Sequence, residues 1–132
     1  MAFDVDNVQL SFTNEFVGEM TSPSGKVLIG AQENGMRPYH LLFGALGSCF
    51  YSTFLAIANK KRLTFEKAEV EVSGEKRTGE VQTLEHVKIV ITIFGGENEA
   101  QLTRSAELGT KFCSIHNTIS QVAKMDLEVV FK

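Results

Sequence analysis

Two cysteines are the residues in this sequence whose type could carry covalent chemistry. Cys49 lies in "ALGSCFYSTFLAIA", residues 45–58, a run without a charged side chain, and Cys113 lies in "KFCSIHNTIS". A cysteine acts as a nucleophile in its thiolate form, which a cation, a helix N-terminus or donated hydrogen bonds stabilise. The two thiols could therefore be separate packing residues, or they could be a redox pair that closes a transient disulfide.

The two cysteines differ in their expected surroundings. By residue type alone, Cys49 in an apolar run is typical of a core cysteine. Cys113 comes just before a short predicted helix, where the backbone N–H groups and the helix dipole favour a thiolate. His116 follows three residues later and could share its helix face. Arg37 is the nearest arginine before Cys49, and it could stabilise the Cys49 thiolate if its loop folds back or if it comes from a partner subunit.

The sequence lacks the motifs for a metal site, a nucleotide site or a serine hydrolase. No C-x-x-C or H-x-x-x-H pair occurs among the two cysteines and the three histidines, so we expect no metal site. The sequence has no G-x-G-x-x-G, no phosphate-binding loop of the P-loop type and no G-x-S-x-G. We therefore expect neither a nucleotide cofactor nor any other cofactor, and no serine hydrolase.

Length and composition predict a single globular domain over residues 1–132. The chain is 43% hydrophobic, and its net charge of −3 does not favour nucleic acid as a partner. No cationic segment followed by an apolar stretch opens the sequence, and two cysteines are too few for a secreted disulfide framework. We therefore expect a cytoplasmic protein whose thiols start reduced.

The element that must position Cys49 is a predicted helix over residues 38 to about 60. Pro38 suits its first turn, and "NKKR" places cations at its C-terminal end. The uncharged residues 38–59 are long enough to span a bilayer, but glycines and polar residues dilute them, so we expect a buried core helix and no membrane contact.

This helix is apolar on nearly all sides. One set of residues recurs at helical spacing, and a second set covers much of the remaining surface: Leu41, Leu42, Ala45, Cys49, Thr53, Ala56 and Ile57, and then Phe43, Leu46, Phe50, Phe54 and Leu55. Such a helix must be enclosed on several sides. A chain of this size can hardly enclose it alone, which predicts a homodimer.

The remaining elements are predicted as grouped strands and helices. Val87, Ile89, Ile91 and Ile93 share one face of the clearest strand, and Leu102, Ala106, Gly109 and Phe112 share one face of a second helix. Ser114 is the expected N-cap of a short third helix. Strands are expected at residues 8–12, 15–20, 26–31, 65–77, 84–95 and 126–131, and the two later helices at 95–112 and 115–124. The strands at 65–77 and 84–95 are expected to form a long hairpin around the polar turn "TGEVQT". Strands in consecutive groups favour an α+β fold.

These features resemble the OsmC/Ohr family, the osmotically induced and organic-hydroperoxide-resistance proteins. The matching segments occur in the family's order and cover almost the whole chain: "RPYHLLFGALGSCF", "VEVSGEKR", "VKIVITI" and "ELGTKFCSIHNTIS". The most specific element is the cysteine pair, one in mid-helix and one opening a short Cys-Ser-Ile segment.

The resemblance implies both a fold and an activity. The fold would be α+β, with antiparallel sheets around a long buried central helix in an intertwined homodimer. The activity would be that of a thiol peroxidase, in which Cys49 reacts with an organic hydroperoxide to form a sulfenic acid and Cys113 resolves it as a disulfide. An external dithiol, such as a protein-bound dihydrolipoyl group, would then reduce the disulfide. This reaction requires the two cysteines to lie within disulfide reach, and we expect them to meet at one end of the buried helix.

The helix entry departs from the family pattern. Members that reduce hydroperoxides usually carry Asn-Pro-Glu there, and the glutamate pairs with an upstream arginine that activates the cysteine. Tyr39 stands at the place of that glutamate, and Arg37 is the first arginine of the chain. We therefore expect Arg37 to activate Cys49. The residues expected to bind substrate are Tyr39, His40, Phe43 and Phe50. The alternative is a non-enzymatic dimer that binds an apolar or thiol-reactive small molecule.

Overall fold

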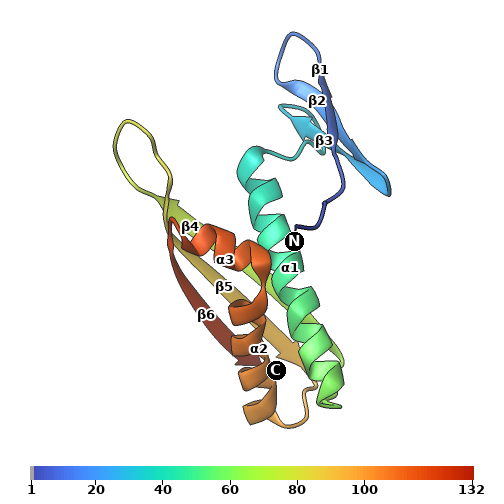
Figure 1. The fold of residues 1–132 in the computed structure, drawn as a ribbon, viewed down its shortest axis with the longest axis vertical. Coiled ribbons are helices and arrows are strands. Elements are labelled where there is room, and N and C mark those ends of the chain that lie inside the picture. The colour runs from blue at the N-terminus through green and yellow to red at the C-terminus, as the bar shows by residue number, and fades with distance from the viewer. Residues whose placement is uncertain (1) are drawn as a thin grey trace. The chain divides into compact units, whose positions relative to one another are not determined.

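The computed structural model describes residues 2–132, which form two compact units with a boundary between Leu42 and Phe43. The first unit contains strands β1 (Gln9–Phe12), β2 (Val17–Ser22) and β3 (Gly25–Gly30) and the first residues of helix α1 (Pro38–Lys60). The second contains the rest of α1, strands β4 (Lys67–Lys76), β5 (Leu84–Phe94) and β6 (Lys124–Phe131), and helices α2 (Glu99–Phe112) and α3 (Ser114–Ser120) (Figure 1). The elements confirm the predicted α+β class.

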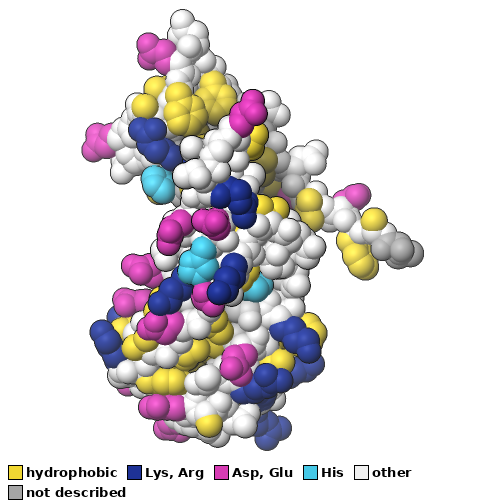
Figure 2. Space-filling view, turned by 90° about the vertical axis from the view of Figure 1, so that its left-hand side faces the viewer, with side chains coloured by type: hydrophobic (Ala, Val, Ile, Leu, Met, Phe, Trp, Pro, Cys, Tyr) yellow, Lys and Arg dark blue, Asp and Glu magenta, His cyan; other side chains and the backbone are white. Residues whose placement is uncertain are grey.

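The N-terminal unit is an antiparallel meander in the order β1-β2-β3. Gly30 ends β3 with a φ of 99°, and a side chain there would collide with the carbonyl oxygen of Phe16. Hydrophobic side chains gather on the surface of this small unit in Figure 2. The exposed large apolar side chains of the sheet and of the segments next to it are Phe3, Val5, Val8, Leu10, Phe12, Phe16, Leu28 and Met36. A three-stranded sheet with no core of its own needs further burial of these side chains to be stable in water.

The second unit is a three-stranded sheet in the order β4-β5-β6 with helices on one face (Figure 1). β4 and β5 pair antiparallel, as the hairpin prediction required. β5 and β6 pair parallel, so the prediction of antiparallel sheets throughout is wrong for this edge. The reason is the connection: the chain leaves β5, crosses through α2 and α3, and returns in the same direction, which a parallel pair requires.

The core lies between this sheet and the helices. Val87, Ile89, Ile91 and Ile93 of β5 are all buried, as their shared face predicted. From the helices, the buried hydrophobic side chains are Leu46, Phe50, Phe54 and Ala58 of α1, Leu102 and Ala106 of α2, and Ile119 of α3. The core face of α1 is therefore the second predicted set, the one with Leu46, Phe50 and Phe54, because that side faces the sheet and α2.

Close approach at two glycines sets the spacing of the layers. A Cβ on Gly109 of α2 would lie 3.2 Å from the Phe50 ring and 3.3 Å from the Phe54 Cβ, so α2 packs tightly on α1. A Cβ on Gly47 would lie 3.3 Å from Val72, which places α1 over β4. Phe112 was predicted on the buried face of α2, but it is 64% exposed because α2 ends at this residue and the chain turns away.

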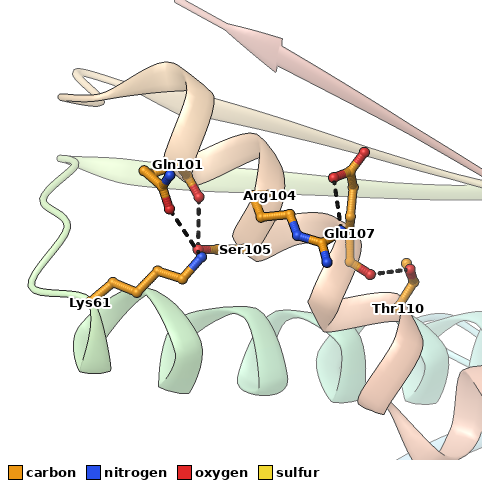
Figure 3. Close-up of polar contacts among 6 residues, drawn as sticks. All are labelled: Lys61, Gln101, Arg104, Ser105, Glu107 and Thr110. Atoms are coloured by element: carbon orange, nitrogen blue, oxygen red, sulfur yellow. Dashed lines mark hydrogen bonds and ion pairs between the residues drawn. The ribbon is translucent and has the colours of Figure 1, made fainter.

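Polar contacts tie the start of α2 to the end of α1 (Figure 3). Lys61 Nζ donates to Gln101 Oε1 at 3.3 Å, and the buried Ser105 hydroxyl donates to the Gln101 carbonyl at 2.8 Å. Further along α2, Arg104 pairs with Glu107, whose carbonyl accepts the Thr110 hydroxyl at 2.7 Å. Of these contacts, only the Lys61–Gln101 hydrogen bond joins α2 to the end of α1, and the others lie within α2.

The outer face of the second sheet carries charges of both signs in Figure 2. On neighbouring strands, His86 pairs with Asp126 at 2.5 Å, and Lys88 pairs with Glu128 at 2.9 Å. The sheet thus has one face in the core and one face in water, which explains the alternation of apolar and polar residues along β5.

Within residues 2–132, only α1 is long and apolar enough to cross a membrane by length and composition, with a mean hydropathy of 1.8. The core helix of a soluble protein has the same properties. Only 28% of that stretch is buried within the chain, so much of the apolar surface of α1 lacks a partner in a single copy.

Candidate active site

Cys49 lies at the middle of α1, next to residues of the junction between α2 and α3. Three consecutive residues of this junction form hydrogen bonds with the Cys49 sulfur: Cys113, Ser114 and Ile115. The two cysteines were expected to meet at one end of the helix. They meet at its midpoint instead, because α2 runs back along α1 and places the junction there.

Cys113 is the break between the two helices. α2 ends at Phe112, α3 begins at Ser114, and Cys113 between them has an extended backbone with φ of −76° and ψ of 117°. Its sulfur accepts the backbone N–H of His116 at 3.3 Å, so Cys113 is the N-cap of α3. The prediction of Ser114 as N-cap is wrong by one residue, because the extended residue and the accepting side chain both belong to Cys113.

The surroundings of Cys49 favour its thiolate. Burial raises the pKa of the thiol, but four donated hydrogen bonds oppose this and together lower the pKa below its ordinary value. The donors are the Cys113 thiol, the backbone N–H of Ile115, the Ser114 hydroxyl and the Ser114 backbone N–H. Within its own unit, the Cys49 thiolate is therefore stabilised by neutral hydrogen-bond donors and not by a charged group.

The pKa of Cys113 moves in the opposite direction. Burial raises it first, and the neighbouring Cys49 sulfur raises it further, because ionisation would remove the proton that Cys113 donates. The side chain of Cys113 is fully buried, whereas that of Cys49 is partly exposed. At neutral pH the pair therefore holds one proton-donating thiol and one thiol that ionises more easily.

His116 does not act as a cation in this site. Burial lowers the pKa of its imidazole, so the ring is neutral at neutral pH. Its contribution to the site is the backbone N–H, which donates a hydrogen bond to the Cys113 sulfur. A positive charge on His116 does not account for the stabilisation of either thiolate.

The predicted entry residues belong to the other unit. Arg37, Tyr39 and His40 lie in the N-terminal unit, and Cys49 and Cys113 lie in the second. The Arg37 backbone N–H donates to His40 Nδ1 at 3.1 Å, which fixes the ring at the start of α1.

The two predicted phenylalanines occupy different places. Phe50 is fully buried in the core and stacks on Phe54, with ring centroids 6.4 Å apart, so it acts as a packing residue within this chain. Phe43 lines an open groove of about 390 Å³ between α1 and β4. The other lining residues of this groove are Gly44, Gly47, Ser48, Tyr51, Val70 and Val72.

Three functional candidates were missed from the sequence: Ser114, Ile115 and Asn117. Ser114 and Ile115 bond to Cys49, and the Asn117 side chain bonds to the Cys113 carbonyl. Their only sequence signal was their proximity to Cys113. Within residues 2–132, no three His, Cys, Asp or Glu side chains are grouped so that they could hold a metal ion.

A family model described as OsmC-like protein matches residues 30–128, three quarters of the chain. The chain belongs to the OsmC-like protein family. No curated protein sequence matches it.

Solved structures share the fold of this OsmC-like protein over nearly its full length. A hypothetical protein from Aquifex aeolicus VF5 is 24% identical with a TM-score of 0.83, covering 98% of this chain and 99% of that one. An OsmC-like protein from Mycoplasma pneumoniae is 19% identical with a TM-score of 0.85, covering 97% of each. The organic hydroperoxide resistance protein OhrB of Bacillus subtilis is 17% identical with a TM-score of 0.71, covering 97% and 99%.

Proposed function

We propose that this protein is a thiol-dependent peroxidase that reduces organic hydroperoxides. The observation that carries the proposal is the placement of Cys113, at the junction of α2 and α3, beside Cys49 in the middle of α1, with the pKa values of the two thiols shifted in opposite directions. Such a pair supplies a nucleophile and a neighbouring thiol that can resolve it. The organic hydroperoxide resistance proteins among the structural neighbours share its fold and support the same substrate class.

The reaction balances with these two sulfurs and an external dithiol. The Cys49 thiolate attacks the terminal oxygen of the hydroperoxide, the O–O bond breaks, and the leaving alkoxide takes a proton to become an alcohol. Cys49 is now a sulfenic acid. Cys113 attacks the Cys49 sulfur, the S–S bond forms, and the hydroxyl leaves as water with the Cys113 proton. An external dithiol, such as a dihydrolipoyl protein, reduces the disulfide. We place this cycle in the cytoplasm, where such dithiols stay reduced.

Trapping of each intermediate tests the proposal. With stoichiometric cumene hydroperoxide, the wild type should form a Cys49–Cys113 disulfide within one chain and should turn over when a dithiol is added. The Cys113→Ser variant should stop at a Cys49 sulfenic acid that a dimedone probe labels. The Cys49→Ser variant should leave Cys113 largely unoxidised. Absence of both turnover and disulfide in the wild type would refute the peroxidase.

Arg37 is the proposed cation for Cys49, supplied when residues 1–132 fold as one OsmC-like domain within the dimer. The Arg37→Ala variant should then slow alkylation of Cys49 at neutral pH far more than at alkaline pH, where the thiol ionises without help. The matched control is Arg104→Ala, because Arg104 is an exposed arginine that pairs with Glu107. Equal rates for wild type and Arg37→Ala at all pH values would remove Arg37 from the site.

The protein is proposed to act as an intertwined homodimer. The support is the apolar surface of α1 that one copy leaves uncovered, together with the exposed apolar side chains of the N-terminal sheet. Sedimentation should find no folded monomer at micromolar concentration. A stable monomer would contradict the dimer.

A second function has its own support in the groove beside Phe43. The groove is lined mainly by apolar residues of α1 and β4, so it suits an apolar small molecule bound without turnover. Binding of such a ligand without hydroperoxide consumption would favour this binding module. In that case, the Tyr51→Ala variant should weaken binding while the Ser114→Ala variant leaves it unchanged.

A further inference from the structure

Asn117 of α3 has no part in the proposed reaction, yet its side chain bridges the junction that carries Cys113. The side-chain nitrogen Nδ2 donates to the carbonyl oxygens of Lys111 and Cys113, each at 2.9 Å. Its backbone N–H donates to the same Cys113 carbonyl at 3.0 Å. One side chain therefore connects the last turn of α2 with the residue that caps α3.

This bridge acts at the point where α2 ends and α3 begins. Lys111 lies in the last turn of α2, where carbonyl groups lack partners within the helix, and Cys113 has left the helical conformation. With both carbonyls bound to one nitrogen, the two helix ends cannot separate or rotate about Cys113 without loss of a hydrogen bond. The restrained segment also contains Ser114 and Ile115, which donate to Cys49.

We propose that Asn117 is a positioning residue that holds Cys113 against Cys49 and thereby favours the disulfide over the two free thiols. In the reduced protein, a junction without this bridge would spread Cys113 over more conformations. The disulfide restricts Cys113 whether or not the bridge is present, so loss of the bridge stabilises the reduced state relative to the oxidised state. The inference depends on the proposed function in one respect only, namely that the peroxidase reaction gives the disulfide its biological use.

The test measures the thiol–disulfide equilibrium of the full-length protein without any hydroperoxide. The protein is equilibrated in glutathione buffers of known redox ratio, the thiols are trapped by alkylation, and mass spectrometry gives the fraction with a Cys49–Cys113 disulfide. Asn117→Asp keeps the side-chain shape but removes both donated hydrogen bonds, and Asn117→Ala removes the whole amide. Each should lower the equilibrium constant about tenfold, the scale of about 1.4 kcal/mol expected for hydrogen bonds of this kind.

The control is Thr118→Ala on the same helix. The Thr118 hydroxyl donates to the Ser114 carbonyl at 3.1 Å, a bond within α3 that does not cross the junction. Thr118→Ala should keep the wild-type equilibrium constant, and an equal fall in this variant would overturn the proposal.

Thermal unfolding of the reduced variants separates positioning from simple stabilisation. Variants of Asn117 that unfold at a lower temperature but keep the wild-type equilibrium constant would show a structural role only and would overturn the proposal. A wild type that forms the disulfide in glutathione but consumes no hydroperoxide would refute the peroxidase while the Asn117 comparison stands. A wild type that forms no disulfide in any buffer would refute both.

Discussion

The Ser114 hydroxyl is the one side-chain donor to Cys49 that can be removed without touching a thiol. Ser114→Ala leaves the backbone N–H donors and Cys113 in place. The lost bond joins a hydroxyl to a developing thiolate, and we take about 1 kcal/mol for it because sulfur is a weak acceptor and Cys49 is partly exposed. The pKa of Cys49 should rise, and the thiolate population at neutral pH should fall about fivefold.

The observed rate changes by less than the population, because a thiolate of higher pKa is a better nucleophile. With a Brønsted coefficient of about 0.5, each thiolate reacts about twofold faster in the variant. The net result is alkylation about twofold slower at neutral pH and about twofold faster at strongly alkaline pH, where both proteins are fully ionised. The two pH–rate curves should therefore cross.

The assay follows modification of Cys49 by iodoacetamide over a range of pH, with peptide mass spectrometry to separate it from Cys113. The matched control is Ser120→Ala, which removes the same hydroxyl from the same helix, where it donates to the Asn117 carbonyl at 2.7 Å. Curves for Ser114→Ala and wild type that coincide at every pH would refute the role of this hydroxyl. An equal shift in Ser120→Ala would show that the effect comes from α3 as a whole.

Three further outcomes follow from the same geometry. Limited alkylation at neutral pH should modify Cys49 well before Cys113, because hydrogen bonds lower the pKa of Cys49, and burial raises that of Cys113 and shields it; equal labelling in peptide mass spectrometry would contradict this asymmetry. Gly109→Ala should lower the free energy of unfolding in urea by about 1–2 kcal/mol, because the new Cβ presses on two core phenylalanines, and Gly47→Ala, which meets only the methyl groups of two valines, should cost less. The hydrogen bond from His86 lowers the pKa of Asp126, so the pair stabilises the fold above the ordinary carboxyl pKa and this contribution is lost as the pH falls through the lowered pKa; Asp126→Asn should be slightly less stable than wild type near neutral pH and equally stable in strong acid, as measured by circular dichroism.

Local patterns along the chain were enough to predict most of the elements. The helix over residues 38–60 and the hairpin of β4 and β5 were predicted because periodicity and turn residues act between near neighbours. Residue types also identified the two cysteines, and the resemblance assigned them to one site. Local patterns could not predict which of the two apolar residue sets of α1 faces the core. A helix that is apolar on nearly all sides carries no signal for the side that packs on the sheet.

Tertiary packing decided the features on which the chemistry depends. The parallel pairing of β6 follows from the path of α2 and α3, and the same path brings Cys113 to the middle of α1. Cys113 is the single non-helical residue between α2 and α3. Its extended backbone decides which residue caps α3 and which groups donate to Cys49. Contacts between residues so far apart in the chain depend on how closely the helices pack, as at Gly109, and no local pattern encodes that distance.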